Sequence, residues 1–409
     1  MWESVIWPDL QGKKVLLAVT GGIAAYKAAE LCRQLAKSGA AVRVMMTAAA
    51  RRFVGEVTFA ALSDSPVSTD IFDPGQEDNI GHIELADWAD LLVVAPATAN
   101  TLAKLAGGVA EDVVGTVYLA CTAPVLLAPA MNVNMWQHPA TQANMELLRQ
   151  RGHRVVGPGS GELACGHVGQ GRMAEPVEIL QAAGGCLAPQ DLSGNRLLIS
   201  AGPTHEALDP VRFVGNRSSG KMGFAVAAEA AARGAEVTLV AGPSALPTPL
   251  NVERLDVTSA AEMAEAVRLA AASQAAVIMA AAVADYTPAT VADSKLKKAK
   301  VGENMTLELE RTVDILASLG NLSPRPYLVG FAAETEENLD GVAPDKLKRK
   351  GCDLLVANDV GAHDAGFETD QNRVIIYDAA GGKEVIPLQA KRLVAARILD
   401  RVASALREE

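Results

Sequence analysis

Uncharged polar side chains gather directly after a short apolar run in the first half of the chain. Val125–Ala128 has the length and composition of a buried strand, and Pro129–Trp136 (PAMNVNMW) adds amide, thioether and indole groups. Ligands bind at the carboxyl ends of strands in open α/β sheets. The composition of this loop suits a flat, uncharged reacting group. An Asn-capped packing loop is the alternative that the segment alone leaves open.

Two more predicted strands of this half end in polar or glycine-rich loops. Lys13–Thr20 leads into Gly21-Gly22 and a helical segment, a pattern in which the backbone can approach a phosphate. It lacks the G-x-G-x-x-G fingerprint, so NAD is not indicated. Leu91–Ala95 is followed by 96–101 (PATANT), which is rich in hydroxyl and amide groups. Three such loops in one half of the chain predict a bound cofactor.

Two residues of the first half have side chains suited to proton transfer. His82 stands within 81–90, and an imidazole ordinarily titrates near neutral pH, which suits a general base. A helix-cap histidine is the alternative that this segment alone favours. Cys165 lies at the centre of the glycine-rich segment 157–172, which predicts a long mobile loop that closes over a substrate. A flexible linker with an incidental cysteine is the other interpretation.

The second half carries its polar groups in two loops and a basic helix. Asp209–Gly223 is rich in Arg, Asn and Ser, and 285–300 follows a predicted strand. In a protein of net charge −11 the second loop predicts neutralisation of a polyphosphate, with Asp285 facing a base or a Mg²⁺-bound water. A solvated lysine face is the alternative. The run 346–350 ends a predicted helix, where basic residues are common in any case. The lysines of the second loop are Lys295, Lys297, Lys298 and Lys300.

Composition limits the class of protein. The 409 residues are enough for two or three domains, and 49% of them are hydrophobic while 4% are aromatic, so the cores are built from Ala, Val and Leu. The net charge of −11 argues against nucleic-acid binding. Five cysteines without a C-x-x-C pair fit a reducing cytoplasm better than a disulfide or zinc framework. We expect no signal peptide, because the first residues include Glu3 and Asp9 and no long apolar core, and no apolar run reaches the roughly 18 residues that span a bilayer.

The elements that must position these groups alternate between strand and helix, with one interruption at Gly184–Gly194. We therefore expect an α/β fold of two doubly wound, Rossmann-like domains, residues 1–189 and 190–409. The predicted strands are 13–20, 41–46, 91–95, 125–128, 196–201, 236–241, 276–280, 327–332, 354–358 and 373–377. The predicted helices are 23–38, 102–105, one from 138, 221–233, 260–273 and 389–406.

Short motifs in a fixed order cover nearly the whole chain. In the first half they are 21–27 (GGIAAYK), 82–85 (HIEL), 96–101, 129–136 and 161–172. In the second half they are 202–204 (GPT), 216–223 (NRSSGKMG), 280–285, 295–298, 330–335 (GFAAET) and 357–359 (AND). This combination resembles the bacterial bifunctional family in which phosphopantothenoylcysteine decarboxylase is fused to phosphopantothenate–cysteine ligase, in coenzyme A biosynthesis.

The resemblance implies that the first domain is a flavodoxin-like, FMN-dependent decarboxylase of 4'-phosphopantothenoylcysteine. FMN would take a hydride equivalent from the cysteine moiety, and the resulting thioaldehyde eases loss of CO₂. His82 matches the catalytic base, Asn132 the residue that holds the substrate carboxylate, and Cys165 the residue that protonates the ene-thiol. Flavin sites of this family lie between subunits, which implies a homo-oligomer. Flavin contacts are implied at Gly21, Gly22, Ile23, Thr47, Thr98 and Ala99.

For the second domain the resemblance implies a nucleotide-binding ligase. The family activates the carboxylate of 4'-phosphopantothenate with CTP, releasing pyrophosphate, and L-cysteine then displaces CMP. Asn216 matches the residue needed to turn over the acyl-cytidylate, and Lys295 the residue needed to form it. Mg²⁺ is implied by the nucleotide chemistry, with ligands that the sequence does not identify. Nucleotide contacts are implied at Met279, Ala280, Ala281, Asp285, Lys295, Phe331, Lys346 and Lys350.

The sequence departs from the family pattern at Thr287, where many relatives carry Arg, and the first ten residues match no part of it. Three other functions compete with this one. A non-catalytic flavin- or nucleotide-binding regulator leaves His82, Asn132, Cys165 and Lys295 unexplained. A decarboxylase of peptidyl cysteine has no use for the second domain. A short-chain oxidoreductase is disfavoured because no Tyr-x-x-x-Lys element follows a suitable strand.

Overall fold

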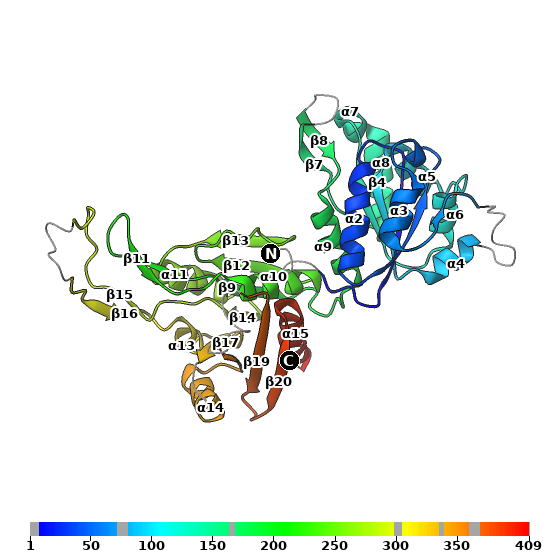
Figure 1. The fold of residues 1–409 in the computed structure, drawn as a ribbon. Coiled ribbons are helices and arrows are strands. Elements are labelled where there is room, and N and C mark those ends of the chain that lie inside the picture. Colours follow the sequence, from blue (N-terminus) through cyan, green and yellow to red (C-terminus); the bar gives the residue numbers. More distant parts are fainter. Residues whose placement is uncertain are drawn as a thin grey trace. The chain divides into compact units, whose positions relative to one another are not determined.

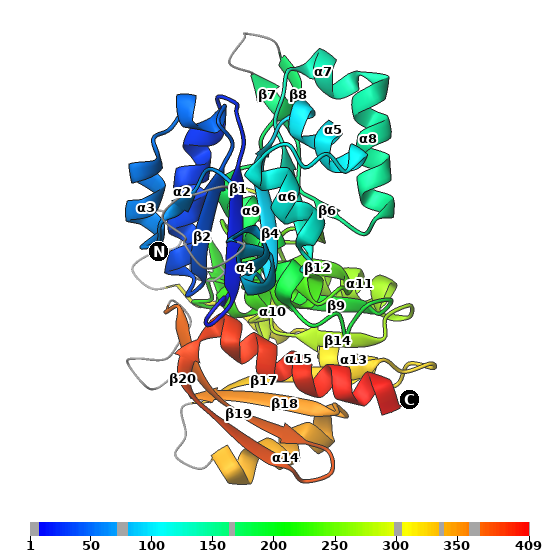
Figure 2. The same ribbon diagram turned by 90° about the vertical axis from the view of Figure 1, so that its right-hand side faces the viewer.

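The computed structural model describes residues 8–71, 81–162, 168–297, 305–334, 339–359 and 369–408. The chain forms two compact units, an N-terminal unit of Trp7–Ala188 and a C-terminal unit built on Pro189–Glu409. Both are layered α/β structures (Figures 1 and 2). None of their described helices is long and apolar enough to cross a bilayer.

The N-terminal unit is organised around a parallel six-stranded sheet in the order β3-β2-β1-β4-β5-β6. Apart from the two-residue edge strand β3, this order is the flavodoxin-like order 2-1-3-4-5. The strands are β1 (Lys14–Val19), β2 (Ala41–Met46), β3 (Val67–Ser68), β4 (Leu91–Ala97), β5 (Val125–Pro129) and β6 (Arg154–Val155). The helices are α2 (Ala25–Lys37), η1 (Ala50–Arg52), α3 (Glu56–Ser63), α4 (Gly81–Trp88), α5 (Ala99–Gly107), α6 (Val113–Ala120), α7 (Val133–Gln137), α8 (Pro139–Gln150) and α9 (Pro176–Leu187).

Two cores cover the two faces of this sheet. Val15, Leu17 and Val19 of β1 pack with α2, α3 and α9, whereas Leu16 and Ala18 pack with α4, α5, α6 and α8. Because both faces are buried, the strands are continuous apolar runs, which is why the sequence identifies them well. The predicted doubly wound fold is confirmed.

The C-terminal unit contains an eight-stranded sheet in the order β13-β12-β9-β14-β17-β18-β19-β20, parallel except for β19 and β20. The parallel strands taken in chain order give 3-2-1-4-5-6, the Rossmann order, which reverses between β9 and β14. The strands are β9 (Arg196–Ala201), β12 (Glu236–Ala241), β13 (Val252–Asp256), β14 (Ala276–Met279), β17 (Tyr327–Glu334), β18 (Leu354–Asp359), β19 (Gln371–Asp378) and β20 (Lys383–Ala390). The helices are α10 (Lys221–Ala232), α11 (Ala260–Ala271), α13 (Ile315–Leu319), α14 (Leu339–Lys350) and α15 (Lys391–Glu408).

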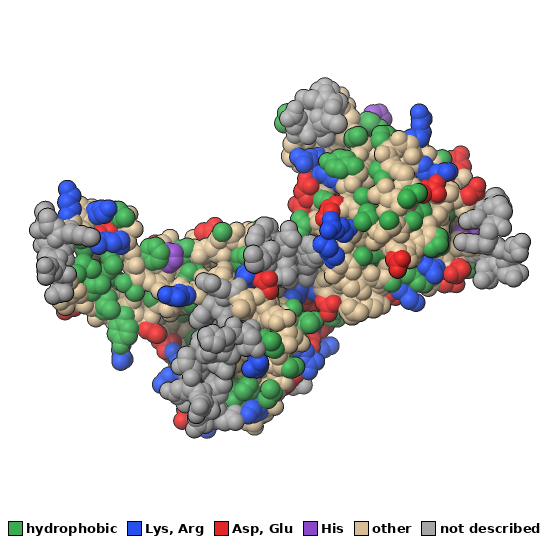
Figure 3. All heavy atoms as spheres, viewed as in Figure 1, with side chains coloured by type: hydrophobic (Ala, Val, Ile, Leu, Met, Phe, Trp, Pro, Cys, Tyr) green, Lys and Arg blue, Asp and Glu red, His purple; other side chains and the backbone are tan. Residues whose placement is uncertain are grey.

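Two small antiparallel pairs extend beyond this sheet and form what we call the arm (Figure 1). One pairs β10 (His205–Ala207) with β11 (Phe213–Gly215), and the other pairs β15 (Tyr286–Pro288) with β16 (Leu309–Arg311). The arm exposes Phe213, Tyr286, Leu309 and other apolar side chains. Figure 3 shows hydrophobic atoms on the surface of this part of the C-terminal unit. The sequence analysis did not predict the arm.

The structure corrects two predictions around the first polar loop. The glycine-rich segment is not irregular where it is described, because β7 (Gly159–Glu162) pairs with β8 (Val168–Arg172). The glycines of this hairpin permit close packing: a Cβ at Gly171 would lie 2.3 Å from the Met131 carbonyl oxygen, and one at Gly169 would lie 2.9 Å from Val133. The second correction is that α7 begins at Val133, inside the segment expected to be a loop.

Candidate active sites in the two units

In the N-terminal unit, the loops after β1, β2 and β4 meet at the carboxyl edge of the sheet. Thr20 Oγ1 donates to the Pro96 carbonyl at 2.6 Å and lies 3.4 Å from the Thr98 amide nitrogen. A Cβ at Gly21 would lie 2.3 Å from that of Ala49, and one at Gly22 would lie 3.4 Å from the Thr98 methyl group. The structure therefore brings the predicted flavin positions of these loops together, at the reversal of strand order where doubly wound folds bind ligands.

Thr98 shows why this edge presents polar groups. It is the N-cap of α5, and its hydroxyl accepts from the Thr101 amide at 3.3 Å and lies 3.0 Å from the Thr101 hydroxyl. Capping fixes the start of the helix and directs its first amides towards the loop after β1. Ile23, which follows the two glycines, is 60% exposed, so an apolar surface flanks the polar edge.

Asn132 is held by two neighbouring elements. Its Oδ1 accepts from the Asn134 amide at 2.9 Å and caps α7, which leaves the NH₂ group as the donor side of the amide. The Met131 amide donates to the Gly171 carbonyl at 2.9 Å, so the hairpin of β7 and β8 supports the same loop. The loop that the sequence singles out is thus braced from the glycine-rich segment.

His82 is the second residue of α4, and its side chain is partly exposed. Arg43 of β2 fixes this helix through an ion pair with Glu84 at 3.1 Å and a cation–π contact with Trp88 at 4.7 Å. Figures 1 and 2 both place α4 and α7 at different ends of the unit, so His82 and Asn132 do not come together within one chain. Cys165 lies outside the described residues.

The other cysteines of the described chain are poorly suited to nucleophilic or acid–base work. Burial raises the pKa of Cys32 to about 12 and that of Cys186 and Cys352 to about 11, and it also raises the pKa of Cys121. These side chains remain protonated at neutral pH, as expected for structural cysteines.

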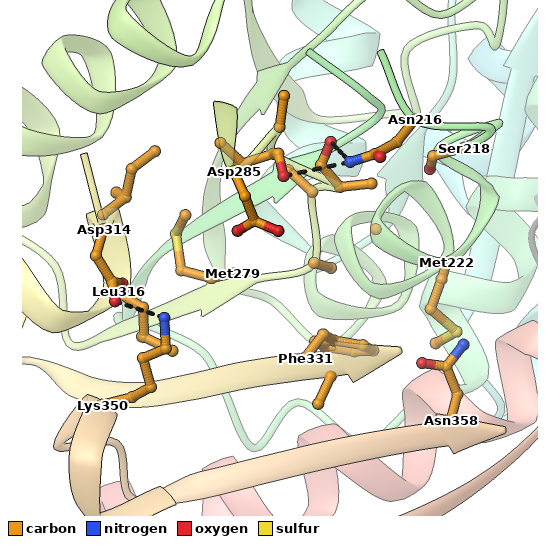
Figure 4. Close-up of a pocket in the computed structure, with 18 of the residues that line it drawn as sticks. Asn216, Ser218, Met222, Met279, Asp285, Asp314, Leu316, Phe331, Lys350 and Asn358 are labelled. Atoms are coloured by element: carbon orange, nitrogen blue, oxygen red, sulfur yellow. Dashed lines mark hydrogen bonds and ion pairs between the residues drawn. The ribbon is translucent and has the colours of Figure 1, made fainter. Parts of the chain in front are cut away.

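In the C-terminal unit, a cavity of about 810 Å³ lies where the strand order reverses between β9 and β14. Its walls come from the loops after these two strands and from β17, β18, α13 and α14. Figure 4 shows the Asp285 carboxylate pointing into the space between Met279 and Phe331. The predicted positions that line the cavity are Asn216, Met279, Ala280, Ala281, Asp285, Phe331, Lys346 and Lys350.

Asn216 joins the loops that follow the two switch-point strands. Its Nδ2 donates to the carbonyl oxygens of Ala282 at 3.1 Å and Val283 at 3.2 Å, as the dashed lines in Figure 4 mark. Ser200 Oγ accepts from the Ala281 amide at 3.1 Å, and Thr204 Oγ1 accepts from the Ala284 amide at 2.9 Å. These bonds fix the cavity wall, and they orient the Asn216 amide with its oxygen as the remaining acceptor.

Basic side chains stand at two sides of the cavity. On one side, Lys350 forms an ion pair with Asp314 at 2.5 Å, and Asp314 also caps α13 through the Ala317 amide (Figure 4). On the other side, Lys221 at the start of α10 forms an ion pair with Asp370 at 2.7 Å. Basic side chains outnumber acidic ones in the lining, and this excess of positive charge suits a ligand that carries several phosphates. The basic residues are Lys221, Arg311, Lys346, Arg349, Lys350 and Lys391, and the acidic ones are Asp285 and Asp314.

Lys391 also lines the cavity, on the side of Lys221, and its amine is buried. It is 2% exposed and donates to the Thr369 carbonyl at 2.5 Å. Burial and the charge of Lys221 lower the pKa of Lys391 to about 8, while Asp370 opposes the shift. An anionic ligand near these lysines would favour the charged form of Lys391.

Lys295 is not among the described residues that line the cavity. It is exposed on the segment between β15 and β16. Tyr286 at the start of β15 and Arg311 at the end of β16 line the cavity. Lys297, near Lys295 in sequence, is also exposed, whereas Lys298 and Lys300 lie outside the described residues. Thr287 pairs with Glu310 within the arm.

Several lining residues escaped the sequence analysis, among them Asp314, Lys221 and Lys391. Asp314 had a usable signal, since an aspartate directly before an apolar helical segment is a common N-cap. Lys221 and Lys391 each begin a long helix, and no local pattern indicates that these two helix starts face one cavity.

Two family models match this chain, one over each of the two units. Residues 8–186 match the family described as "Flavoprotein", and residues 192–406 match "DNA/pantothenate metabolism flavoprotein C-terminal domain". The chain is 49% identical to "Coenzyme A biosynthesis bifunctional protein CoaBC" of Vibrio cholerae over 392 residues, which cover 96% of this chain and 98% of that protein. The protein of the same name from Bacillus subtilis is 49% identical over 399 residues, which cover 97% and 98%. The solved C-terminal domain of a CoaBC protein has 43% sequence identity and a TM-score of 0.46, and the match covers 54% of this chain and 100% of that one.

Proposed function

The chain belongs to the coenzyme A biosynthesis bifunctional protein family, and from this premise we propose which residues carry its two activities. The protein is a bifunctional enzyme with a flavoprotein decarboxylase domain and a ligase domain. We propose that residues 190–409 join 4'-phosphopantothenate to L-cysteine with CTP. Residues 1–189 then decarboxylate the resulting 4'-phosphopantothenoylcysteine to 4'-phosphopantetheine. A non-catalytic regulator is not favoured.

The observation that carries the ligase assignment is the cavity between β9 and β14, with basic groups on two sides. The substrate carboxylate attacks the α-phosphorus of CTP and expels pyrophosphate, and the amine of cysteine then displaces CMP. In this proposal Lys346, Lys350 and Lys221 neutralise phosphate charge, and Asn216 presents an amide to the acyl-cytidylate. Lys295 enters from the segment beside the cavity and stabilises the charge that develops at phosphorus.

Mg²⁺ is proposed to arrive with the triphosphate rather than to occupy a site made by the protein. The described residues contain no cluster of three or more His, Cys, Asp or Glu side chains that would hold a metal. Mg²⁺ in nucleotide enzymes is commonly bound by one or two carboxylates together with phosphate oxygens and water. Asp285, whose carboxylate points into the cavity, is the candidate carboxylate (Figure 4).

The N-terminal edge fits FMN. Gly21 lets the turn after β1 pack closely against Ala49, since a Cβ there would lie 2.3 Å from that of Ala49, and the start of α5 supplies polar groups. Gly21, Gly22, Ile23, Thr47, Thr98 and Ala99 would hold the cofactor. When bound, FMN supplies the acceptor for the hydride equivalent of the cysteine moiety.

Three side chains of the protein take part in the decarboxylation. Asn132 donates a hydrogen bond to the substrate carboxylate, His82 moves a proton as general base, and Cys165 returns a proton to the product. Because α4 and α7 lie at different ends of the unit, we propose a homo-oligomer in which one subunit supplies His82 and its neighbour supplies Asn132. We also propose that the enzyme works in the cytoplasm.

Flavin dependence tests this division of labour. Purified protein is expected to be yellow, with a flavin absorption spectrum. Removing the flavin should abolish CO₂ release from 4'-phosphopantothenoylcysteine while CTP-dependent pyrophosphate release continues, and adding FMN should restore CO₂ release. Colourless protein that releases CO₂ at the full rate would contradict the assignment of the first domain.

A further inference from the structure

A buried carboxylate in the arm holds the segment that carries Lys295. Asp209 lies in the turn between β10 and β11, is 3% exposed, and accepts from the Leu296 amide through Oδ2 at 3.1 Å. Arg212, from the same turn, donates through Nη2 to the Leu296 carbonyl at 2.9 Å. Both backbone groups of Leu296, the residue directly after Lys295, are therefore bound to this turn.

The two oxygen atoms of the Asp209 carboxylate bind different partners. Oδ1 accepts from the amides of Val211 and Arg212, each at 2.8 Å, and so shapes its own turn. Oδ2 accepts from the Arg212 guanidinium, from Nε at 3.0 Å and from Nη2 at 2.6 Å, besides the distant Leu296 amide. Of these contacts only the one between Oδ2 and the Leu296 amide reaches beyond the turn.

The link is stable across the neutral pH range and is reinforced nearby. The Arg212 guanidinium, helped by the three amide donors, holds the pKa of Asp209 well below its usual range. The Ala292 amide donates to the Leu208 carbonyl at 3.0 Å, so the segment meets this turn at a second point. Asn216 directly follows β11, so the same hairpin also leads into the residue proposed to act on the acyl-cytidylate.

We propose that Asp209 is a positioning residue of the ligase, which fixes the peptide between Lys295 and Leu296 and thereby sets where the Lys295 ammonium meets the nucleotide. This rests on the function proposed for Lys295. An exposed lysine with four rotatable bonds needs a fixed backbone if its charge is to stand at a defined place in the transition state.

Asp209→Asn tests the link. The amide keeps an oxygen for the local turn but presents an NH₂ group to the Leu296 amide and to Arg212, where it cannot accept. Pyrophosphate release should fall by about 10- to 100-fold in kcat with little change in KM for CTP, because misplacement of about 1 Å costs this much. CO₂ release from 4'-phosphopantothenoylcysteine should stay at the wild-type rate.

Glu206→Gln is the matched control. Glu206 is a second buried carboxylate of the same hairpin, 4% exposed, whose Oε1 accepts from the Ala260 amide at 2.9 Å and so anchors β10 elsewhere. It should leave pyrophosphate release unchanged. If Asp209→Asn does not fold, Asp209→Ser replaces it, since a hydroxyl can satisfy the local amides but is too short to reach Leu296.

A double-mutant cycle decides whether Asp209 acts through Lys295. If it does, adding Asp209→Asn to Lys295→Gln causes no further loss of pyrophosphate release. Full additivity, with Lys295→Gln itself impaired, would overturn the positioning role and leave the proposed function standing. Wild-type pyrophosphate release by Lys295→Gln would overturn the role of Lys295 and the positioning proposal together.

Discussion

Lys295→Gln is expected to lower CTP-dependent pyrophosphate release by about 100- to 1,000-fold, the usual cost of removing one group that stabilises charge in a transition state. Glutamine keeps much of the length and polarity of lysine but cannot offset the charge that develops as the substrate carboxylate attacks phosphorus. CO₂ release from supplied 4'-phosphopantothenoylcysteine should be unaffected. Pyrophosphate release under saturating substrates and CO₂ release are measured on the same preparation.

Lys348→Gln provides the control for Lys295. Lys348 is exposed on α14 and is not among the described residues that line the cavity. The same charge change at this position should leave both activities near wild type. Equal losses from the two variants would mean that net positive charge near the cavity, rather than a placed ammonium, supports the reaction.

His82→Ala is expected to have the reverse effect, lowering CO₂ release by about 100- to 10,000-fold, the range for loss of a general base. The neighbouring Glu84 does not take the place of the imidazole, because it is paired with Arg43. Pyrophosphate release should stay at the wild-type rate. The measurement is CO₂ release from 4'-phosphopantothenoylcysteine as a function of pH.

His153→Gln is the control for His82. His153 lies 2.7 Å from the Tyr118 hydroxyl, and burial lowers its pKa, so it serves packing in the N-terminal unit. Glutamine retains a partner for Tyr118, and CO₂ release should persist. A His82→Ala enzyme that decarboxylates as fast as this control would remove His82 from the proposed site.

How far the fold follows from sequence depends on burial. The bounds of β2, β9 and β12 match the predicted ranges, because each is a largely buried run; β9 and β12 also begin at a charged residue and are followed by glycine. β13 was missed because it lies at the sheet edge and its side chains are half-buried or exposed, so Val252–Asp256 carries no apolar run. The hairpin of β7 and β8 was missed because its glycines are explained by contacts with Met131 and Val133, which are distant in sequence.

Some residues of the C-terminal site could be predicted from the sequence and others could not. Asn216, Asp285 and Phe331 fall together in one cavity because they follow or belong to strands beside the switch point, a relation that strand order alone supplies. Lys391 and the Asp209–Leu296 link could not be predicted, since each depends on packing between segments about 80 residues or more apart in sequence. Local sequence patterns carry no information about such contacts.

The order of product release from the intact enzyme tests the central claim most directly. Protein supplied with 4'-phosphopantothenate, L-cysteine, CTP and Mg²⁺ is expected to release pyrophosphate first and CO₂ after a lag, in equal final amounts, and to form 4'-phosphopantetheine. Omitting CTP should abolish both products. CO₂ released from 4'-phosphopantothenate and cysteine without CTP, or flavin-loaded protein that releases neither product, would contradict the two-domain account.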